Sequence, residues 1–584
     1  MVSKRWASLL PVVRISAPAD SPPRREEYYR YYDSGFIKFT DKNLLPVPKL
    51  STPALLRTLS RAPSVTFLAL GDGAVDFYDD SFLTSLLAAC PKLTCLTLGE
   101  PRFADAPPPF TISFASLNSF FRAAAPQLQE LALLLPYEAR KHLDSISSLS
   151  SLRVLRLRSD TIQRLPDGLC YLPALQELQF SCSMLWDVPE DFGQLKALTR
   201  LSIVDSQNGA HSLPDSLGDL SSLTSLCIAF PCGRLPNSIT ALQQLRRLQL
   251  RRYDSDFPDG CEAWTRLEEV SLEKCSLHLT DVFIPSPLSH LARLLSLRKL
   301  RITKSAHLPH SEPFIPFIPE NISDLAALES LELKERVSDK EAASYRSMLA
   351  RMARGEEPQP ERCNQLEHLP REFGSLGTLT RVVIEGSFSS LPDTLGGLTS
   401  LQEASLKFPV LASLPPSFCL LSRLHTLTIT GSDCLVTLPA DFGSLGALQH
   451  LSIHSCSRLH SLPDSFSSLA SLLHLTITKC PKLSTLPDGF GSLPRLARLA
   501  VIYCDSFTHL PASFPCLPSL RVASFSCCPR LHALPAYIGL LLALEVLLLR
   551  ECVALRTLPD SLRQAKALRH VDLSKSGVAN VGRA

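Results

Sequence analysis

Five cysteines recur at a constant interval near the end of the chain, and thiols with such regular spacing could hold a metal ion or undergo redox chemistry. They lie 24 residues apart, each five residues after the middle of a Leu-x-x-Leu-x-Leu unit. If the units stack in parallel, the thiols point the same way at about 4.8 Å spacing, whereas a disulfide needs opposed Cβ atoms about 3.8 Å apart. No pair forms the Cys-x-x-Cys that zinc sites favour. We therefore expect a buried structural column at Cys456, Cys480, Cys504, Cys528 and Cys552.

Histidines offer a second candidate for metal chemistry. His450 and His474 occupy equivalent positions of adjacent units, about 5 Å apart if the units stack, and His454 follows four residues after the first. No carboxylate or cysteine converges on them, which favours a solvated polar surface over a metal site. No Ser-His-Asp set or pair of carboxylates can be assembled from the sequence either. We therefore expect a protein that is not an enzyme, with no catalytic, cofactor-binding or metal-binding residues and no cofactor.

These residues are positioned by a repeat that runs through most of the 584 residues. Within each unit, an alternation such as Leu475-Thr476-Ile477 predicts a short strand with one buried face. Connections of about 20 residues are too long for hairpins, so they favour parallel strands that line one concave face. The middle positions of the twenty units are Leu68, Leu96, Leu131, Leu155, Leu178, Leu201, Leu226, Leu248, Val270, Leu300, Leu331, Val382, Ala404, Leu427, Leu451, Leu475, Leu499, Ala523, Leu547 and Val571.

Proline and glycine mark the half of each unit that returns to the next strand. Many units carry an apolar-Pro-Asp step, as at Leu462-Pro463-Asp464. Proline loses no hydrogen bond at a first helical position, and the following Asp favours the helix start. Glycines such as Gly396, Gly443 and Gly491 can close the turn. The predicted fold is an α/β leucine-rich-repeat solenoid, a right-handed superhelix with a parallel concave sheet and short helical turns and loops on its convex side, in about twenty repeats.

The repeat pattern resembles two groups of known proteins. The string Leu-x-x-Leu-x-Leu-x-x-Cys-x-x-Leu-x-x-Leu-Pro occurs from Leu472 to Pro487, with Ile477 at its third apolar position, and from Leu544 to Pro559. It resembles the repeat region of plant intracellular immune (disease-resistance) receptors, and the LPDSLG and LPDTLG steps resemble Ras-group leucine-rich-repeat scaffolds. The resemblance implies protein recognition in intracellular defence or signal transduction. The sequence departs from those receptors because it holds no Gly-x-x-x-x-Gly-Lys-Ser/Thr loop, and so no nucleotide-binding domain.

Composition narrows the partners and the compartment. A net charge of +3 is too small for a chain of this length to attract nucleic acid, and no apolar run reaches the roughly 18 to 20 residues that cross a bilayer. The sequence has 18 cysteines and no convincing secretory signal, which favours a reducing, cytoplasmic location. The first acidic residue is Asp20, so an organelle transit peptide is the alternative.

The outward positions of five late strands form the candidate docking face. Only one of the fifteen positions, Arg498, carries a fixed charge, whereas the matching positions of earlier strands include Arg156, Glu273 and Lys334. Charge depletion marks the centres of protein interfaces, although Thr, Val and Ser also simply suit strands. With Tyr503 at the edge as an anchor, the predicted partner-binding residues are Thr426, Thr428, Thr430, His450, Ser452, His454, His474, Thr476, Thr478, Arg498, Ile502, Tyr503 and Ser524.

Four segments are expected along the chain. Residues 1–61 are an amino-terminal cap or flexible leader, 62–333 are irregular leucine-rich repeats, and 366–584 are regular repeats of 22 to 24 residues. Between the two repeat blocks, 334–365 is a charged insert. Its Ser338 and Glu341 form a capping box, which predicts a short amphipathic helix either folded back on the solenoid or offered to a partner.

The favoured function is a non-catalytic scaffold that binds one or more proteins on its concave face, with no nucleic-acid or membrane partner. The alternative is a substrate-receptor subunit of a ubiquitin ligase, in which residues 1–61 would engage the ligase core, although they hold no clear F-box pattern. A metal-dependent or thiol enzyme is a third interpretation, and it lacks a motif. The sequence does not determine the oligomeric state.

Overall fold

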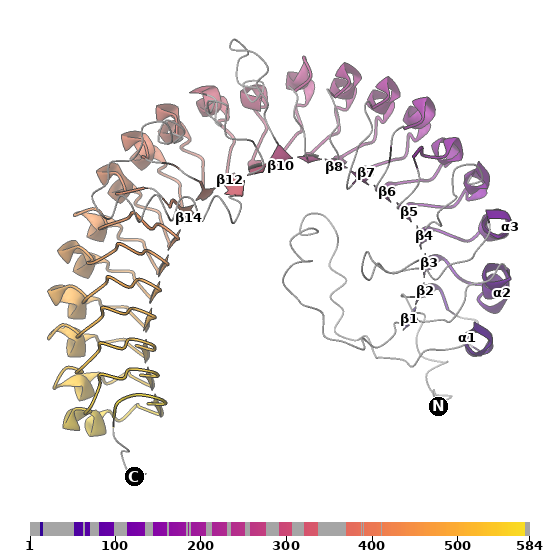
Figure 1. The fold of residues 1–584 in the computed structure, drawn as a ribbon. Coiled ribbons are helices and arrows are strands. Elements are labelled where there is room, and N and C mark those ends of the chain that lie inside the picture. Colours follow the sequence, from indigo (N-terminus) through magenta and orange to yellow (C-terminus); the bar gives the residue numbers. More distant parts are fainter. Residues whose placement is uncertain are drawn as a thin grey trace, which may run out of the picture. The chain divides into compact units, whose positions relative to one another are not determined.

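The computed structural model describes most of the repeat region. The described residues are 12–15, 52–61, 65–70, 81–98, 114–134, 144–159, 163–182, 185, 188–205, 213–229, 235–251, 257–275, 291–305, 320–336, 369–386, 388, 390–409 and 411–578. The chain divides into two compact units, unit 1 (Met1–Arg266) and unit 2 (Leu267–Ala584). In each unit the strands lie on one side and the short helices on the other (Figure 1).

The described part of unit 1 holds nine parallel strands in sequential order, each paired with the next along the chain. They are β1 (Val12–Ile15), β2 (Phe67–Leu70), β3 (Cys95–Leu98), β4 (Glu130–Leu134), β5 (Val154–Ser159), β6 (Glu177–Cys182), β7 (Arg200–Asp205), β8 (Ser225–Ala229) and β9 (Arg247–Arg251).

The return segments of unit 1 begin as α-helices and become 3₁₀ turns. The α-helices are α1 (Thr52–Leu59), α2 (Phe82–Ala89) and α3 (Phe114–Ala124). The 3₁₀ helices are η1 (Asp144–Ser148), η2 (Asp167–Tyr171), η3 (Glu190–Gln194), η4 (Asp215–Asp219), η5 (Asn237–Ala241) and η6 (Cys261–Ala263).

The described part of unit 2 holds twelve parallel strands, again each paired with the next. They are β10 (Glu269–Cys275), β11 (Lys299–Ser305), β12 (Ser330–Arg336), β13 (Arg381–Glu385), β14 (Glu403–Lys407), β15 (Thr426–Thr430), β16 (His450–His454), β17 (His474–Thr478), β18 (Arg498–Ile502), β19 (Val522–Ser524), β20 (Val546–Leu548) and β21 (His570–Asp572).

All the described return segments of unit 2 are 3₁₀ helices. They are η7 (Leu291–Arg293), η8 (Glu320–Asp324), η9 (Arg371–Ser375), η10 (Asp393–Gly397), η11 (Pro416–Leu420), η12 (Phe442–Ser444), η13 (Asp464–Ser468), η14 (Asp488–Ser492), η15 (Phe514–Cys516), η16 (Ile538–Leu540) and η17 (Asp560–Gln564).

The predicted repeat fold is confirmed, because each of the twenty predicted units contributes one strand. Within unit 1 and within unit 2, the middle residue of each strand pairs with the middle residue of the next strand, as Leu451 with Leu475 and Leu475 with Leu499. Side chains alternate along these strands, and β17 has the burial pattern of a strand with one covered face. The sequence analysis missed β1, which pairs with β2 and lies inside the segment expected to be a cap or leader.

The prolines lie one position earlier than predicted, immediately before the 3₁₀ helix and not at its first residue. Pro463 and Pro487 precede η13 and η14 in extended conformation, with ψ of 154° and 148°. Their carbonyl oxygens accept the first hydrogen bond of each turn, from the backbone N–H of Phe466 and of Phe490, both at 3.0 Å. Proline suits this place because its ring fixes φ and its missing N–H is not needed there.

The glycines lie within the turns instead of closing them, contrary to the prediction. Gly443 and Gly491 lie within η12 and η14. A Cβ on Gly443 would meet the carbonyl oxygen of Ser465 at 1.8 Å, and one on Gly491 would meet that of Ser513 at 1.9 Å. Close contact between successive repeats therefore requires glycine here, rather than a special backbone angle.

A serine of the next repeat satisfies the backbone at this contact. The N–H of Gly443 donates to the Oγ atom of Ser465 at 3.1 Å, and the N–H of Gly539 donates to that of Ser561 at 3.2 Å. Two steps of the column depart from this pattern, and at the first of them Ser467 stands at the glycine position with Gly489 at the serine position. The second step replaces both residues. Pro515 stands at the glycine position and Tyr537 at the serine position. Proline has no N–H to satisfy, so no serine is needed opposite it.

Stacked phenylalanine rings fill the core beneath these turns. The rings of Phe442, Phe466, Phe490 and Phe514 are fully buried. Their centroids are 6.1, 6.2 and 6.3 Å apart and their planes lie within 12° of parallel. The same sequence period that aligns the strands thus aligns an aromatic column on the helix side.

Two sequence predictions lie outside the described residues. The predicted helix of the insert, with Ser338 and Glu341, falls in the segment 337–368, and most of the predicted cap falls in 1–11 and 16–51. Among the described residues, no helix combines the length and apolarity needed to cross a bilayer.

We expect Gly443→Ala to destabilise unit 2, because its Cβ would overlap the Ser465 carbonyl oxygen and the two repeats would have to move apart. Overpacking of this kind lowers the free energy of unfolding by roughly 2 kcal/mol or more. The midpoint of urea denaturation, followed by far-UV circular dichroism, measures the effect.

The matched control is Gly446→Ala, three residues away, whose Cβ would find its nearest atom at 4.0 Å. This variant should change the free energy of unfolding by no more than about 0.5 kcal/mol. Equal midpoints for the two variants would contradict the close-contact explanation.

Candidate functional site

The predicted docking residues lie mainly on the outward side of strands β15 to β19, which we call the strand face. The register sets its side chains in rows across the strands. One row runs through Thr426, His450, His474, Arg498 and Val522, and the next through Thr428, Ser452, Thr476, Ala500 and Ser524. The polar side chains of β15, β16 and β17 are half-buried, so the face is a closely packed surface.

Two histidines contact each other in the first row. The Nδ1 atoms of His450 and His474 are 3.0 Å apart, and the ring centroids are 4.7 Å apart. One ring donates and the other accepts, which requires at least one of them to be neutral. Burial, followed by the nearby charges of His450 and Arg498, lowers the pKa of His474 below its usual range.

His454 belongs to a different contact on the same face. Its Nδ1 atom forms a hydrogen bond with the Oγ1 atom of Thr478 on the next strand. Burial lowers the pKa of His454, which favours the uncharged form of this ring as well. The described residues bring no third His, Cys, Asp or Glu close enough to either pair to complete a metal-binding group.

The remaining predicted residues differ in how much surface they offer. Arg498 is exposed and Ile502 is half-buried. Ser524 was predicted to contact a partner, but only 6% of it is exposed and its Oγ atom lies 3.2 Å from that of Ser526. Ser524 therefore supports the face without presenting a hydroxyl to a ligand.

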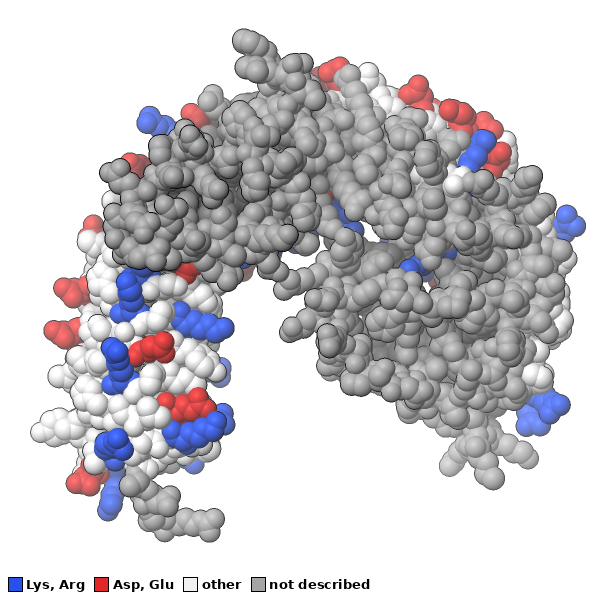
Figure 2. Space-filling model, viewed as in Figure 1, with Lys and Arg blue, Asp and Glu red and all other residues white. Residues whose placement is uncertain are grey.

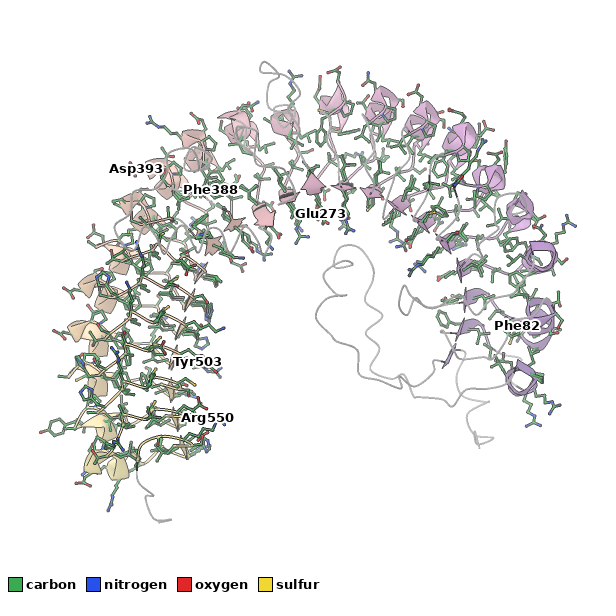
Figure 3. The ribbon with its side chains drawn as sticks, in the orientation of Figure 1. Phe82, Glu273, Phe388, Asp393, Tyr503 and Arg550 are labelled. Atoms are coloured by element: carbon green, nitrogen blue, oxygen red, sulfur yellow. The ribbon has the colours of Figure 1, made fainter. Side chains whose placement is uncertain are left out.

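Tyr503 lies just beyond the strand face. It stands where β18 ends, is 54% exposed, and has a left-handed backbone with φ of 57°. In Figure 3 it lies on the strand side of unit 2, as Arg550 does, whereas Asp393 lies on the helix side. A hydrogen bond with the thiol of Cys527, on the next repeat, raises the pKa of the Tyr503 phenol.

The left-handed position of Tyr503 recurs in the repeats of β15 to β21, and the sequence analysis did not detect it. Each of these backbone N–H groups except the last donates to a carbonyl oxygen of the next repeat, as from Lys479 to Ile502 at 2.9 Å. Gly431, the first in the column, was the only sequence signal. The column comprises Gly431, Ser455, Lys479, Tyr503, Cys527, Glu551 and Lys575, with φ between 55° and 61°.

Earlier strands of unit 2 carry charges that pair across the sheet. Arg301 on β11 contacts Glu332 on β12 at 2.9 Å, and the ammonium of Lys334 lies 2.6 Å from the same carboxylate. Burial opposes ionisation of Glu332, but hydrogen bonds from Arg301 and Lys334 hold its pKa below the usual range. The uncharged strand face thus begins where this ion-paired part of the sheet ends.

The five column cysteines are fully buried. Each thiol lies near backbone oxygens, as in the contact from the Sγ atom of Cys480 to the carbonyl of Thr478 at 3.5 Å and from Cys528 to Val501 at 3.4 Å. Burial raises the pKa of Cys504 to about 12 and that of Cys552 to about 11. Such thiols form little thiolate near neutral pH, and this arrangement suits packing better than reactivity.

The chain is similar in sequence to known leucine-rich-repeat proteins. Residues 127–233 match the family model of the leucine-rich repeat region. A stretch of 221 residues is 28% identical to TMV resistance protein N of Nicotiana glutinosa, and the match covers 32% of this chain and 18% of that protein. The chain therefore spans less than a fifth of this relative's length. The resemblance predicted from the repeat pattern is confirmed.

One solved structure shows the same fold at a TM-score of 0.50. A chain of the Toll–Spatzle complex of Drosophila aligns with a TM-score of 0.50 and 18% identity, covering 72% of this chain and 53% of that chain. A leucine-rich-repeat protein of Leptospira interrogans aligns with a TM-score of 0.48 and 20% identity, covering 74% and 95%. The parallel strands and the family match agree with the first of these likenesses.

We expect the column thiols to resist alkylation in the native chain. At pH 8, iodoacetamide should modify the exposed Cys516 and leave Cys504, Cys528 and Cys552 unmodified until urea is added, because burial raises the pKa of these three and blocks access. Peptide mass spectrometry after timed quenching measures each site. Native labelling of Cys504 as fast as Cys516 would contradict the buried column.

We also expect the histidines of the strand face to make unit 2 less stable in acid. The pKa values of His454 and His474 are lower in the folded chain, so the unfolded chain binds protons first as the pH falls below about 6.5. The free energy of unfolding should therefore fall between about pH 7 and 5. Urea midpoints across this range measure it.

The double variant His454→Gln, His474→Gln should show a shallower fall than the wild type. The control is His532→Gln, an exposed histidine away from the strand face, which should keep the wild-type pH dependence. If the double variant loses stability in acid as steeply as the wild type, these two rings do not carry the effect.

Proposed function

We propose that this chain, a leucine-rich-repeat solenoid, is a non-catalytic scaffold that recognises a protein partner through its strand face. The observation that carries the proposal is the change in charge along the sheet of unit 2. Strands β11 to β14 carry cross-strand ion pairs, whereas the outward positions of β15 to β19 hold a single fixed charge, at Arg498. Protein interfaces are depleted of charge at their centres.

Internal hydrogen bonding supports this assignment. The contact between His450 and His474 and the bond between His454 and Thr478 hold side chains of neighbouring strands together. A face whose side chains are already fixed loses less conformational entropy when a partner binds. The residues we assign to the docking face are those predicted from sequence, with Ser524 in a supporting role and Tyr503 as an anchor at the edge.

We propose a cytoplasmic role in defence or signal transduction. The similarity to a plant resistance protein favours defence, although that match covers only a small part of the relative. The column cysteines Cys456, Cys480, Cys504, Cys528 and Cys552 are free thiols, which suits a reducing compartment. The sequence contains no catalytic motif, so we assign the scaffold no reaction of its own.

The test is affinity capture from a native lysate with the intact chain and with the double variant Ser452→Arg, Thr476→Arg. Both substitutions add a long cation to the middle row of the strand face. We expect a specific set of proteins to be lost from the variant, because a buried unpaired charge at an interface costs several kcal/mol. Each protein lost is then tested for direct binding with purified components.

The matched control is Ser468→Arg, Ser492→Arg, which adds the same number of arginines at exposed positions at the ends of η13 and η14. It should retain the wild-type partners. If the strand-face variant retains the same proteins as the wild type, or if both variants lose the same proteins, docking does not occur on this face.

A further inference from the structure

A second surface of unit 2 carries a row of cations on the flank where the strands end. Arg458, Lys482 and Arg530 each lie seven residues after the middle of their strand, and Arg556 lies nine residues after it. We call these four residues the basic flank. Lys482, Arg530 and Arg556 are exposed and Arg458 is half-buried. Figure 2 shows Lys and Arg side chains, with Asp and Glu side chains among them, over the later repeats.

A second backbone ladder keeps the flank in register. The N–H of His460 donates to the carbonyl of Val436 at 3.3 Å, that of Ser484 to His460 at 3.4 Å, and that of Thr508 to Ser484 at 2.9 Å. The N–H of His532 continues the series to Thr508 at 3.2 Å. Neighbouring repeats therefore keep a strand-like separation of about 4.8 Å on the flank as well as in the sheet.

The cations of the basic flank have no ion-pair partner among the described residues. The ion pairs that the described residues of the later repeats form involve other cations, as in Lys575 with Glu551 at 3.0 Å and Arg550 with Asp572 at 3.1 Å. Two further carboxylates lie on the flank, Asp433 and Asp505. Asp433 already accepts a hydrogen bond from the hydroxyl of Ser457.

Most other carboxylates of these repeats lie on the helix side. Asp464, Asp488 and Asp560 each occupy the first turn of a 3₁₀ helix. Three of these repeats therefore separate their charges, with a carboxylate at the helix start and a cation at the strand exit, as in the pairs Arg458 and Asp464, Lys482 and Asp488, and Arg556 and Asp560. Because like charges in adjacent repeats repel, a row of unpaired cations is unfavourable in the free chain unless an anion covers it.

We propose that the basic flank binds an extended acidic segment of another polypeptide, at a surface separate from the strand face. From Arg458 to Arg556 is four repeat steps, or about 19 Å. An extended peptide spans that distance with about six residues. Carboxylates on such a segment can pair in turn with the four cations. Arg458 and Lys482 are one repeat apart, Lys482 and Arg530 two repeats apart, and Arg530 and Arg556 one repeat apart.

The distribution of charge favours a peptide over a nucleic acid. Asp505 lies in the repeat between Lys482 and Arg530. It would repel a phosphate chain, which is charged at every nucleotide, but it can accept hydrogen bonds from the backbone N–H groups of a peptide. The formal net charge of +3 also gives the whole chain little long-range attraction for nucleic acid.

The test measures binding of a fluorescein-labelled hexaglutamate peptide to the full chain by fluorescence anisotropy at low ionic strength. The flank variant is Arg458→Glu, Lys482→Glu, Arg530→Glu. The control is Arg423→Glu, Arg495→Glu, Lys566→Glu, which reverses three exposed cations outside the basic flank and changes the net charge equally. The milder variant Arg458→Gln, Lys482→Gln, Arg530→Gln serves if charge reversal disturbs folding.

We expect the flank variant to bind hexaglutamate roughly ten-fold more weakly or worse, and the control to stay within about two-fold of the wild type. The glutamine variant should show an intermediate loss. The proposal would be overturned if the flank variant and the control lost hexaglutamate affinity equally. It would also be overturned if the wild type did not bind hexaglutamate. If a six-nucleotide oligothymidylate displaced the labelled peptide more strongly than unlabelled hexaglutamate does, the basic flank would be a nucleic-acid site and not a peptide site.

Discussion

The structure depends on the hydrogen-bonded register between one repeat and the next. Leu451 pairs with Leu475, and Leu475 pairs with Leu499. Because the period is constant, all the remaining residues of a repeat also lie next to the equivalent residues of the following repeat. The same register therefore produces the cysteine column, the phenylalanine column and the contact between Gly443 and Ser465. A substitution at one position of a column therefore affects the equivalent residues of the adjacent repeats, since each repeat is packed directly against the next.

Stacking of equivalent positions restricts which residues a column can hold. Neutral groups tolerate their own copies at about 5 Å, as the thiols and phenyl rings do, but like charges do not. In the earlier strands of unit 2 the signs alternate across the sheet, so Glu273, Arg301 and Glu332 pair in sequence. In β16 and β17 the same requirement is met by two histidines that share a hydrogen bond. The uncharged strand face and the ion-paired region are two solutions to one electrostatic constraint.

The sequence period predicted the strands, but it did not predict the close contact at Gly443 or the left-handed backbone at Tyr503. All twenty middle positions were readable because leucine spacing directly reports a buried, alternating strand. The role of Gly443 was not, because a close approach between repeats leaves no mark that distinguishes it from a turn glycine. The left-handed conformation at Tyr503 accompanies a backbone hydrogen bond to Ser526 of the next repeat, and no preference of tyrosine signals it. The near-complete burial of Ser524 depends on neighbouring repeats, so its outward position alone was misleading.

Positions on the strand face and on the flank can vary independently of the core and of each other. Thr476 and Lys482 belong to the same repeat, and both lie between buried residues that hold the fold, Leu475, Ile477, Cys480 and Leu483. A change at either position leaves the column of leucines intact, whereas a change at Gly443 or Phe466 reaches the next repeat. A solenoid can therefore present an uncharged surface and a cationic surface on the same few repeats, because the constraint that fixes the core leaves these two sets of side chains free.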